Sequence, residues 1–228
     1  MDYRSLNRIA NSDLSEFENF LFGRKTYYSQ KALSTGQQLH RHLLEPHTVG
    51  PCWEPEVDMA QVRSMARAGR RDAFLKWVIR FSQNEQVRLW EDGKTGLLLK
   101  SKLDIVYKER LVVDLKSTSA RSPAAFLKDC QRYSYDRQAA FYLDAIARPG
   151  GPRRRFALVA IQKKKPFSVY RVEFADDSEF VEGGRRKYRF LLDMWAQRQR
   201  QGIPFAPSSW ATPDPTQTSL FIPEILAA

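Results

Sequence analysis

The sequence is poor in cysteine and has no long apolar run, and both absences exclude whole classes of protein. Cys52 and Cys130 are the two cysteines among 228 residues. Two thiols cannot form a disulfide framework, an all-cysteine zinc site or an iron–sulfur cluster, so we expect both to be reduced and without a functional role. No apolar stretch reaches the roughly eighteen residues that a membrane span needs, and the polar N-terminal segment has no apolar signal core. We therefore expect a cytoplasmic protein.

Acidic residues are outnumbered by basic ones. The chain has 26 Asp and Glu against 37 Lys and Arg, which gives a formal net charge of +11. Such a balance favours a polyanionic partner through phosphate contacts, although many basic proteins bind no nucleic acid. Hydrophobic residues make up 43% of the chain, enough for a substantial core. The length fits one α/β domain with elaborations.

The hydrophobic periodicity predicts helices, then a β-hairpin, then further helices around a second strand pair. Helices are expected over residues 12–22, 34–44, 58–82, 122–147 (as one or two helices) and 179–200. Strands are expected over residues 87–90, 96–107, 111–117, 155–162 and 168–174. This order indicates an α/β (α+β) fold in which a central mixed sheet is flanked by helices. We expect the folded domain over residues 1–203, followed by a proline-rich tail over 204–228 that has five prolines.

The most informative segment is the hairpin LLLKSKLDIVYKERLVVDLKSTSA. A three-residue turn at 108–110 would pair Tyr107 with Leu111 and place Asp104 opposite Asp114. Opposed strand residues have Cβ atoms about 4.5–5.5 Å apart, and two carboxylates that close repel unless a cation lies between them. Mg²⁺, which binds oxygen ligands, would resolve this conflict.

Lys116 follows Asp114 by two residues, so both side chains point to the same face of the strand. A metal that activates water, together with an ammonium that stabilises developing charge, suits phosphodiester hydrolysis. The alternative is an ordinary surface ion pair, because Asp-x-Lys is common. The opposed Asp104 and the apolar strand context favour the catalytic interpretation.

A later helix adds two polar side chains. Gln138 and Tyr142 are four residues apart and share one helical face, from which both could reach a phosphate or Lys116. Taken alone, these two residues fit better with a helix that only packs.

In these residues the chain resembles the PD-(D/E)xK nuclease superfamily, and in particular RecE-like (exodeoxyribonuclease VIII) phage-type exonucleases with RecB-like motifs. The resemblance covers most of residues 8–200. It rests on the opening SDLSEFENFLFGRKTYY, the element Gly36–Pro46 (GQQLHRHLLEP), Leu103-Asp104, Asp114-Leu115-Lys116, Gln138-x-x-x-Tyr142 and a closing helix at Gly184–Trp195.

The resemblance implies a Mg²⁺ site, with Mn²⁺ as a substitute, held by His40, Asp104, Asp114 and the main-chain carbonyl of Leu115. Lys116 would be the catalytic lysine, and Gln138 and Tyr142 would be further catalytic residues that support the site and the DNA. The resemblance also implies 5′–3′ digestion of duplex DNA ends in recombination or phage DNA processing, in a bacterial or phage-infected cell. A single-strand annealing partner and a ring-like homo-oligomer would follow as well.

The chain departs from the family pattern in two places. Leu103 replaces the proline of the motif, and residues 48–95 match poorly, which puts DNA-end specificity and assembly in doubt. A structure-specific endonuclease with the same site and a catalytically inactive DNA-binding module remain the alternatives. Candidate phosphate contacts are the basic residues Arg70, Arg71, Lys163, Lys164 and Lys165, with further basic runs at 153–155 and 185–187. Charge runs of this kind are usually solvated surface.

Overall fold

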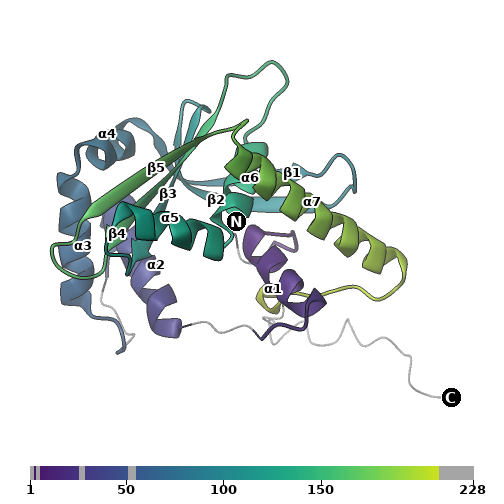
Figure 1. The fold of residues 1–228 in the computed structure, drawn as a ribbon, viewed down its shortest axis with the longest axis horizontal. Helices are drawn as coiled ribbons and strands as arrows, with labels where there is room; N and C mark the ends of the chain where they lie inside the picture. Colours follow the sequence, from purple (N-terminus) through teal and green to yellow (C-terminus); the bar gives the residue numbers. More distant parts are fainter. Residues whose placement is uncertain (1–2, 4–5, 26–28, 51–54, 211–228) are drawn as a thin grey trace.

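The computed structural model describes residues 3, 6–25, 29–50 and 55–210. The helices are α1 (Asn11–Leu21), α2 (Gln30–Leu44), α3 (Met59–Arg71), α4 (Ala73–Phe81), α5 (Pro123–Arg132), α6 (Tyr135–Ala145) and α7 (Glu179–Arg200), with 3₁₀ turns at Pro46–Thr48 and Ser208–Trp210. The strands are β1 (Gln83–Glu91), β2 (Leu98–Tyr107), β3 (Leu111–Thr118), β4 (Arg155–Gln162) and β5 (Val169–Ala175). Figure 1 shows these elements along the chain.

The five strands form one mixed sheet in the order β1-β2-β3-β4-β5. Only β3 and β4 are parallel, and the crossover between them contains α5 and α6. The other neighbours are antiparallel. The fold is therefore the α/β arrangement with a mixed sheet that the sequence predicts.

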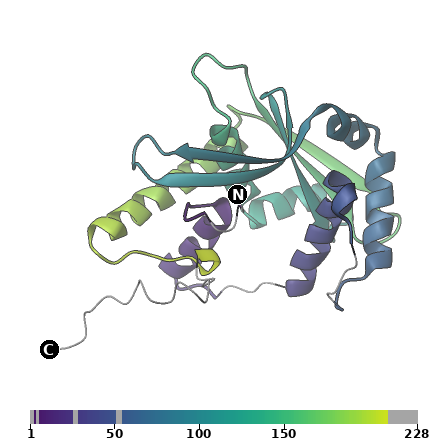
Figure 2. The ribbon, with the colours of Figure 1, turned by 180° about the vertical axis from the view of Figure 1, so that it is seen from behind.

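Helices cover both faces of the sheet, and each face has its own core (Figures 1 and 2). One core joins α2, α3 and α4 to the β3 and β4 side chains Leu111, Val113, Leu115, Val159 and Ile161. The other core joins α1, α6 and α7 to the alternate residues Val112, Phe156 and Leu158. Because side chains alternate along a strand, the continuous apolar runs of β3 and β4 fill both cores.

The prediction of one long helix over residues 58–82 is wrong, because the chain forms two helices there. Asp72 ends α3 with an extended backbone (φ −67°, ψ 124°), and its side chain accepts the Leu75 N–H as the N-cap of α4. An aspartate that caps a following helix is a strong local stop signal, but it leaves the apolar periodicity unchanged. The helix at 122–147 also divides, at residues 133–134, into α5 and α6.

The other boundaries differ by a few residues. α2 begins at Gln30 rather than at Ser34, because Ser29 caps it by accepting the Ala32 N–H. β1 begins at Gln83, four residues before the expected start. β4 and α7 have the expected bounds.

The chain after α7 packs back onto the domain. The Phe205 ring lies 5.1 Å from that of Phe17, and the Ser208 N–H donates to Glu16 in α1. The rest of the expected tail, residues 211–228, lies outside the described residues, and the boundary at 203 stays a prediction. Among the residues described, no helix combines the length and apolarity needed to span a membrane.

The two cysteines remain without an assigned role. Cys130 is a buried free thiol whose pKa burial raises to about 12. Cys52 lies outside the described residues.

Candidate metal centre

The two aspartates of the hairpin lie where β2 and β3 separate. Tyr107 pairs with Leu111, as the three-residue turn predicts, and the ladder continues to Ile105 and Val113. Asp104 and Asp114 would be the next pair, but the ladder stops before them. Instead, the Asp104 carboxylate accepts the Leu115 N–H at 2.7 Å. Both aspartates are buried, so their carboxylates are held at a fork between two strands.

α2 brings His40 to this fork. Its Nε2 lies 2.9 Å from the main-chain carbonyl oxygen of Leu115, and its Nδ1 lies 3.4 Å from Asp104 Oδ1. Burial lowers the pKa of His40, but the Asp104 carboxylate outweighs that effect and raises the pKa to about 9. Burial acts to raise the pKa of Asp104, and the positive charges of His40 and Lys116 bring it below its usual value. An imidazolium thus bridges a carboxylate and a carbonyl oxygen.

Lys116 lies on the other side of the fork. Its Nζ is 2.6 Å from the buried Asp114 Oδ2. Burial raises the pKa of Asp114 to about 6, although Lys116 acts in the opposite direction. Burial lowers the pKa of Lys116, and Asp114 more than reverses this, so the lysine stays charged. The face of the Tyr135 ring lies 4.8 Å from the same Nζ.

A second acidic side chain, Glu85 of β1, approaches Asp104 from the opposite edge of β2. Carboxylate oxygens of Glu85 and Asp104 and a ring nitrogen of His40 lie within 4.8 Å of one another. Glu85 also forms an ion pair with Lys102. Glu85, Lys102 and Tyr135 are candidates that the sequence patterns did not single out. For Glu85 a signal was present, because extending the β1–β2 register from the turn at residues 92–97 places it opposite Asp104.

Gln138 and Tyr142 share a face of α6, as their spacing predicts. The Gln138 amide donates to the Tyr142 hydroxyl at 3.1 Å. Burial raises the pKa of Tyr142 well above its usual value, and the negative charges of Asp114 and Asp104 add to the shift. Tyr142 therefore keeps its proton. Both residues lie behind the fork rather than on the surface of the cleft described next.

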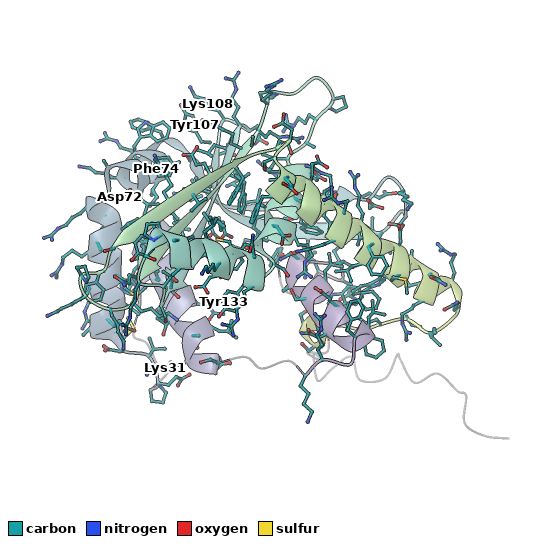
Figure 3. The ribbon with its side chains drawn as sticks, viewed as in Figure 1. Lys31, Asp72, Phe74, Tyr107, Lys108 and Tyr133 are labelled. Carbon is teal, nitrogen blue, oxygen red and sulfur yellow. The ribbon has the colours of Figure 1, made fainter. Side chains whose placement is uncertain are left out.

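The fork opens into a cleft of about 750 Å³ between α2, the end of β3 and α5. His40, Asp104, Leu115 and Lys116 line its floor, and Tyr133 and Lys163 line its walls. Figure 3 labels Lys31, at the start of α2, and Tyr133, which follows α5 and lines the cleft. Of the catalytic candidates, Asp104 and Lys116 line this cleft.

Of the five basic residues predicted to contact DNA, Lys163 lines this cleft. Lys164 and Lys165 follow it as exposed side chains on the β4–β5 link. Arg70 donates to the main-chain carbonyl of His42 at 2.8 Å, so it also joins α3 to α2. Arg71 is exposed at the end of α3.

A second cleft, of about 710 Å³, lies over α6, α7 and the start of β4. Its arginines are engaged with carboxylates, since Arg154 pairs with Asp176 and Arg185 pairs with Asp144 and Asp176. This cleft has balanced charge and no catalytic candidates, so we assign the chemistry to the fork.

The donors at the fork fit a hard divalent cation. The imidazole of His40 and the carboxylates of Asp104 and Glu85 have donor atoms within 4.8 Å of one another. The Leu115 carbonyl oxygen lies 2.9 Å from the His40 ring, and the buried Asp114 carboxylate lies at the same fork. Carboxylate and carbonyl oxygens are the ligands of Mg²⁺ and Mn²⁺. The residues present therefore suit a divalent metal. His40, Asp104, Asp114 and Leu115, the ligands expected from the sequence, lie at the fork, and their role as metal ligands stays a prediction.

Comparison with known proteins identifies the family and the fold. The family described as "PDDEXK-like domain of unknown function" matches residues 13–203. No curated protein sequence matches the chain. The crystal structure of a predicted exonuclease from Eubacterium rectale is similar over 98% of this chain and 91% of that one, with a TM-score of 0.64 and 16% identity.

Two other solved structures are less similar. The crystal structure of an alkaline exonuclease from Laribacter hongkongensis is similar over 87% of this chain and 94% of that one, with a TM-score of 0.46 and 12% identity. A phage-related exonuclease from Haemophilus somnus has a TM-score of 0.45 and 11% identity, over 84% and 82% of the two chains. At 16% identity the Eubacterium rectale structure is evidence for the fold alone. Because the family match covers most of the chain, the protein belongs to the PDDEXK-like family and has the fold of its nucleases.

Proposed function

We propose that the protein is a metal-dependent deoxyribonuclease that hydrolyses phosphodiester bonds at duplex DNA ends. The observation that carries the proposal is the convergence of His40, Asp104 and Lys116 on the floor of one open cleft, with the buried Asp114 carboxylate beside Lys116. Three separate elements contribute these side chains, and packing of α2 against β3 brings His40 to a strand 75 residues away in sequence.

Each side chain has a distinct role in this proposal. Asp104, Asp114, His40 and the Leu115 carbonyl would hold Mg²⁺, which supplies Lewis-acid catalysis of phosphodiester hydrolysis when bound. The Leu115 N–H fixes one Asp104 oxygen and leaves the other facing His40. Hydrogen bonding of this kind orients a metal ligand before the ion arrives.

Lys116 would stabilise the phosphate. Its ammonium remains charged beside Asp114, and it lines the cleft where a scissile phosphate would lie. A fixed positive charge in a partly buried site stabilises the negative charge that develops in the transition state. Gln138 and the protonated Tyr142 of α6 would support the aspartates on the side away from the cleft.

The choice of DNA ends and of 5′–3′ polarity is part of the proposal. It is supported by the resemblance of the ordered motifs to RecE-like exonucleases and by the fold shared with the predicted exonuclease from Eubacterium rectale. The net charge of +11 and the lysines at the β4–β5 link favour a polyanion as substrate. We place the reaction in recombination or phage DNA processing, with a single-strand annealing protein and further copies of this chain as partners. Light scattering of the purified protein tests the homo-oligomer.

The decisive experiment uses linear duplex DNA labelled at the 5′ or the 3′ end, incubated with Mg²⁺ or with EDTA. Wild type is compared with Asp104→Asn and Lys116→Met. Lys94→Met is the control because Lys94 is an exposed lysine in an ion pair with Asp193, away from the cleft. We expect early release of 5′ label that needs Mg²⁺, persists in Lys94→Met and is lost in the other two variants.

The same experiment separates the alternatives when closed circular DNA is added. Metal-dependent cutting of the circle would indicate a structure-specific endonuclease with this site. Salt-sensitive binding without cleavage of either substrate would indicate a catalytically inactive DNA-binding module. Cleavage that survives in Asp104→Asn and Lys116→Met would refute the site.

A further inference from the structure

Glu85 occupies an unusual position in the β1–β2 ladder. The register pairs Asn84 with Ile105 and Gln86 with Leu103, so Glu85 stands opposite Asp104. That one pair is missing from an otherwise regular ladder. Glu85 also has a positive φ of 53°, a conformation that residues other than glycine adopt infrequently. The backbone of β1 thus departs from the strand geometry at the residue that faces the metal-site aspartate.

The side chain of Glu85 is turned into the site. Its carboxylate lies with Asp104 and His40 in a group whose donor atoms are all within 4.8 Å of one another. The Glu85 side chain is 14% exposed, and it lines the same cleft as His40 and Asp104. Ligand atoms of one divalent ion lie about 3–4 Å apart, because each is bound at about 2.0–2.6 Å. Small side-chain rotations would bring the three donors into that range.

We propose that Glu85 is a further ligand of the divalent cation at this centre, on the side of Asp104 that faces away from Asp114. This inference rests on the proposed metal-dependent nuclease, and it adds a residue from β1 to the ligands from α2, β2 and β3. Backbone strain of this kind is found where a functional position requires it.

An ion pair with Lys102 compensates the negative charge of Glu85 when no cation is bound. Lys102 lies two residues before Asp104 on β2, and its ammonium forms an ion pair with Glu85. The Lys102 side chain is 40% exposed, so it is free to turn toward solvent. A cation bound by Glu85 would replace this ammonium, and Lys102 would then be available to a DNA phosphate.

The test is the affinity for Mn²⁺ alone, measured by calorimetry and by the electron paramagnetic resonance signal of free Mn²⁺, without DNA. Glu85→Gln removes the charge, and Glu85→Asp keeps the charge but shortens the side chain. Glu91→Gln is the matched control, because Glu91 is an exposed residue at the other end of the same strand. Circular dichroism checks that each variant is folded.

We expect Glu85→Gln and Glu85→Asp both to weaken Mn²⁺ binding by about tenfold or more, and Glu91→Gln to bind like wild type. Wild-type affinity in Glu85→Gln would overturn the inference and leave the proposed nuclease standing. Full affinity in Glu85→Asp with a loss in Glu85→Gln would also overturn it, since Glu85 would then act through its charge alone. Absence of Mn²⁺ binding in wild type would instead refute the metal-dependent function itself.

Discussion

The ammonium of Lys116 is held between a carboxylate and an aromatic face. Its Nζ lies 2.6 Å from Asp114 Oδ2 and 4.8 Å from the centre of the Tyr135 ring. A cation over a ring face is attracted by the ring's electron density. Tyr135 is the first residue of α6, the helix that also has Gln138 and Tyr142. The start of α6 therefore fixes the direction of the lysine that would face the phosphate.

Replacing Tyr135 should test this arrangement. We expect Tyr135→Leu to lower kcat about tenfold with little change in KM, because a partly desolvated cation–π contact contributes about 1–2 kcal/mol. Tyr135→Phe keeps the ring and should retain most of the activity. Steady-state cleavage of labelled duplex DNA measures both. Equal losses in the two variants would assign the effect to the hydroxyl and contradict the positioning role.

Much of this site follows from local patterns. The register at Tyr107 and Leu111 follows from the three-residue turn, and it places Asp104, Asp114 and Lys116 on neighbouring strands. The period-two alternation of strands then decides which side chains share a face. These rules act over a few residues, so a single sequence contains them.

The remaining parts depend on tertiary packing. His40 reaches Leu115 only because α2 packs against β3, and nothing in the helical pattern separates His40 from His42, which is buried and bonds to the Gln38 carbonyl. The register alone places Glu85 opposite Asp104, but the break in the β1–β2 ladder and the positive φ there have no sequence signature in a glutamate. Only the resemblance to a known family singled out His40, and it did not single out Glu85.

Asp114 should make the metal-free protein less stable above pH 6. Its pKa is raised from 3.8 to about 6 by burial, so the folded state binds more protons than the unfolded state between these values. Stability therefore falls as the pH rises through this window and stays lower above it. Asp114→Asn is neutral at every pH. In EDTA we expect the free energy of unfolding of wild type to fall, relative to that of Asp114→Asn, by about 1–3 kcal/mol between pH 4 and pH 8.

Urea unfolding with and without Mg²⁺ measures this effect. Saturating Mg²⁺ should stabilise wild type at pH 8 and leave Asp114→Asn unchanged, because the variant has lost a ligand. If the difference in stability between the two proteins did not change between pH 4 and pH 8 in EDTA, burial would not raise the pKa of Asp114.

The raised pKa of His40 predicts that metal binding releases a proton. The pKa of His40 is raised to about 9, so the ring is protonated at pH 7.5, and a cation can bind Nδ1 only after the proton leaves. Affinity for Mg²⁺ or Mn²⁺ should therefore increase with pH up to about 9. Calorimetry at pH 7.5 in two buffers of different ionisation enthalpy counts the released protons. We expect about one per ion in wild type and close to none in His40→Gln, and the same release in both would rule out His40 as the source.

The contact between α6 and α7 depends on one of two adjacent glycines. A Cβ at Gly184 would meet the main-chain carbonyl of Asp136 and would lie 2.7 Å from Arg137 N, whereas a Cβ at Gly183 would come no closer than 3.7 Å to a side-chain atom of Arg186. Backbone atoms cannot yield as a flexible side chain does, so Gly184→Ala must push the two helices apart. We expect it to lower the free energy of unfolding by about 3 kcal/mol or more.

Gly183→Ala is the matched control in the same turn of α7. Alanine is a better helix former than glycine, so this variant should be as stable as wild type or more stable by up to about 1 kcal/mol. Urea unfolding of the two variants measures the difference. Because α6 has Gln138 and Tyr142 and begins with the tyrosine that contacts Lys116, Gly184→Ala should also reduce DNA cleavage under conditions where it is still folded. Equal stability of the two variants would mean that α6 and α7 do not meet at Gly184. That contact would then not hold α6, with Gln138 and Tyr142, in place beside the aspartates.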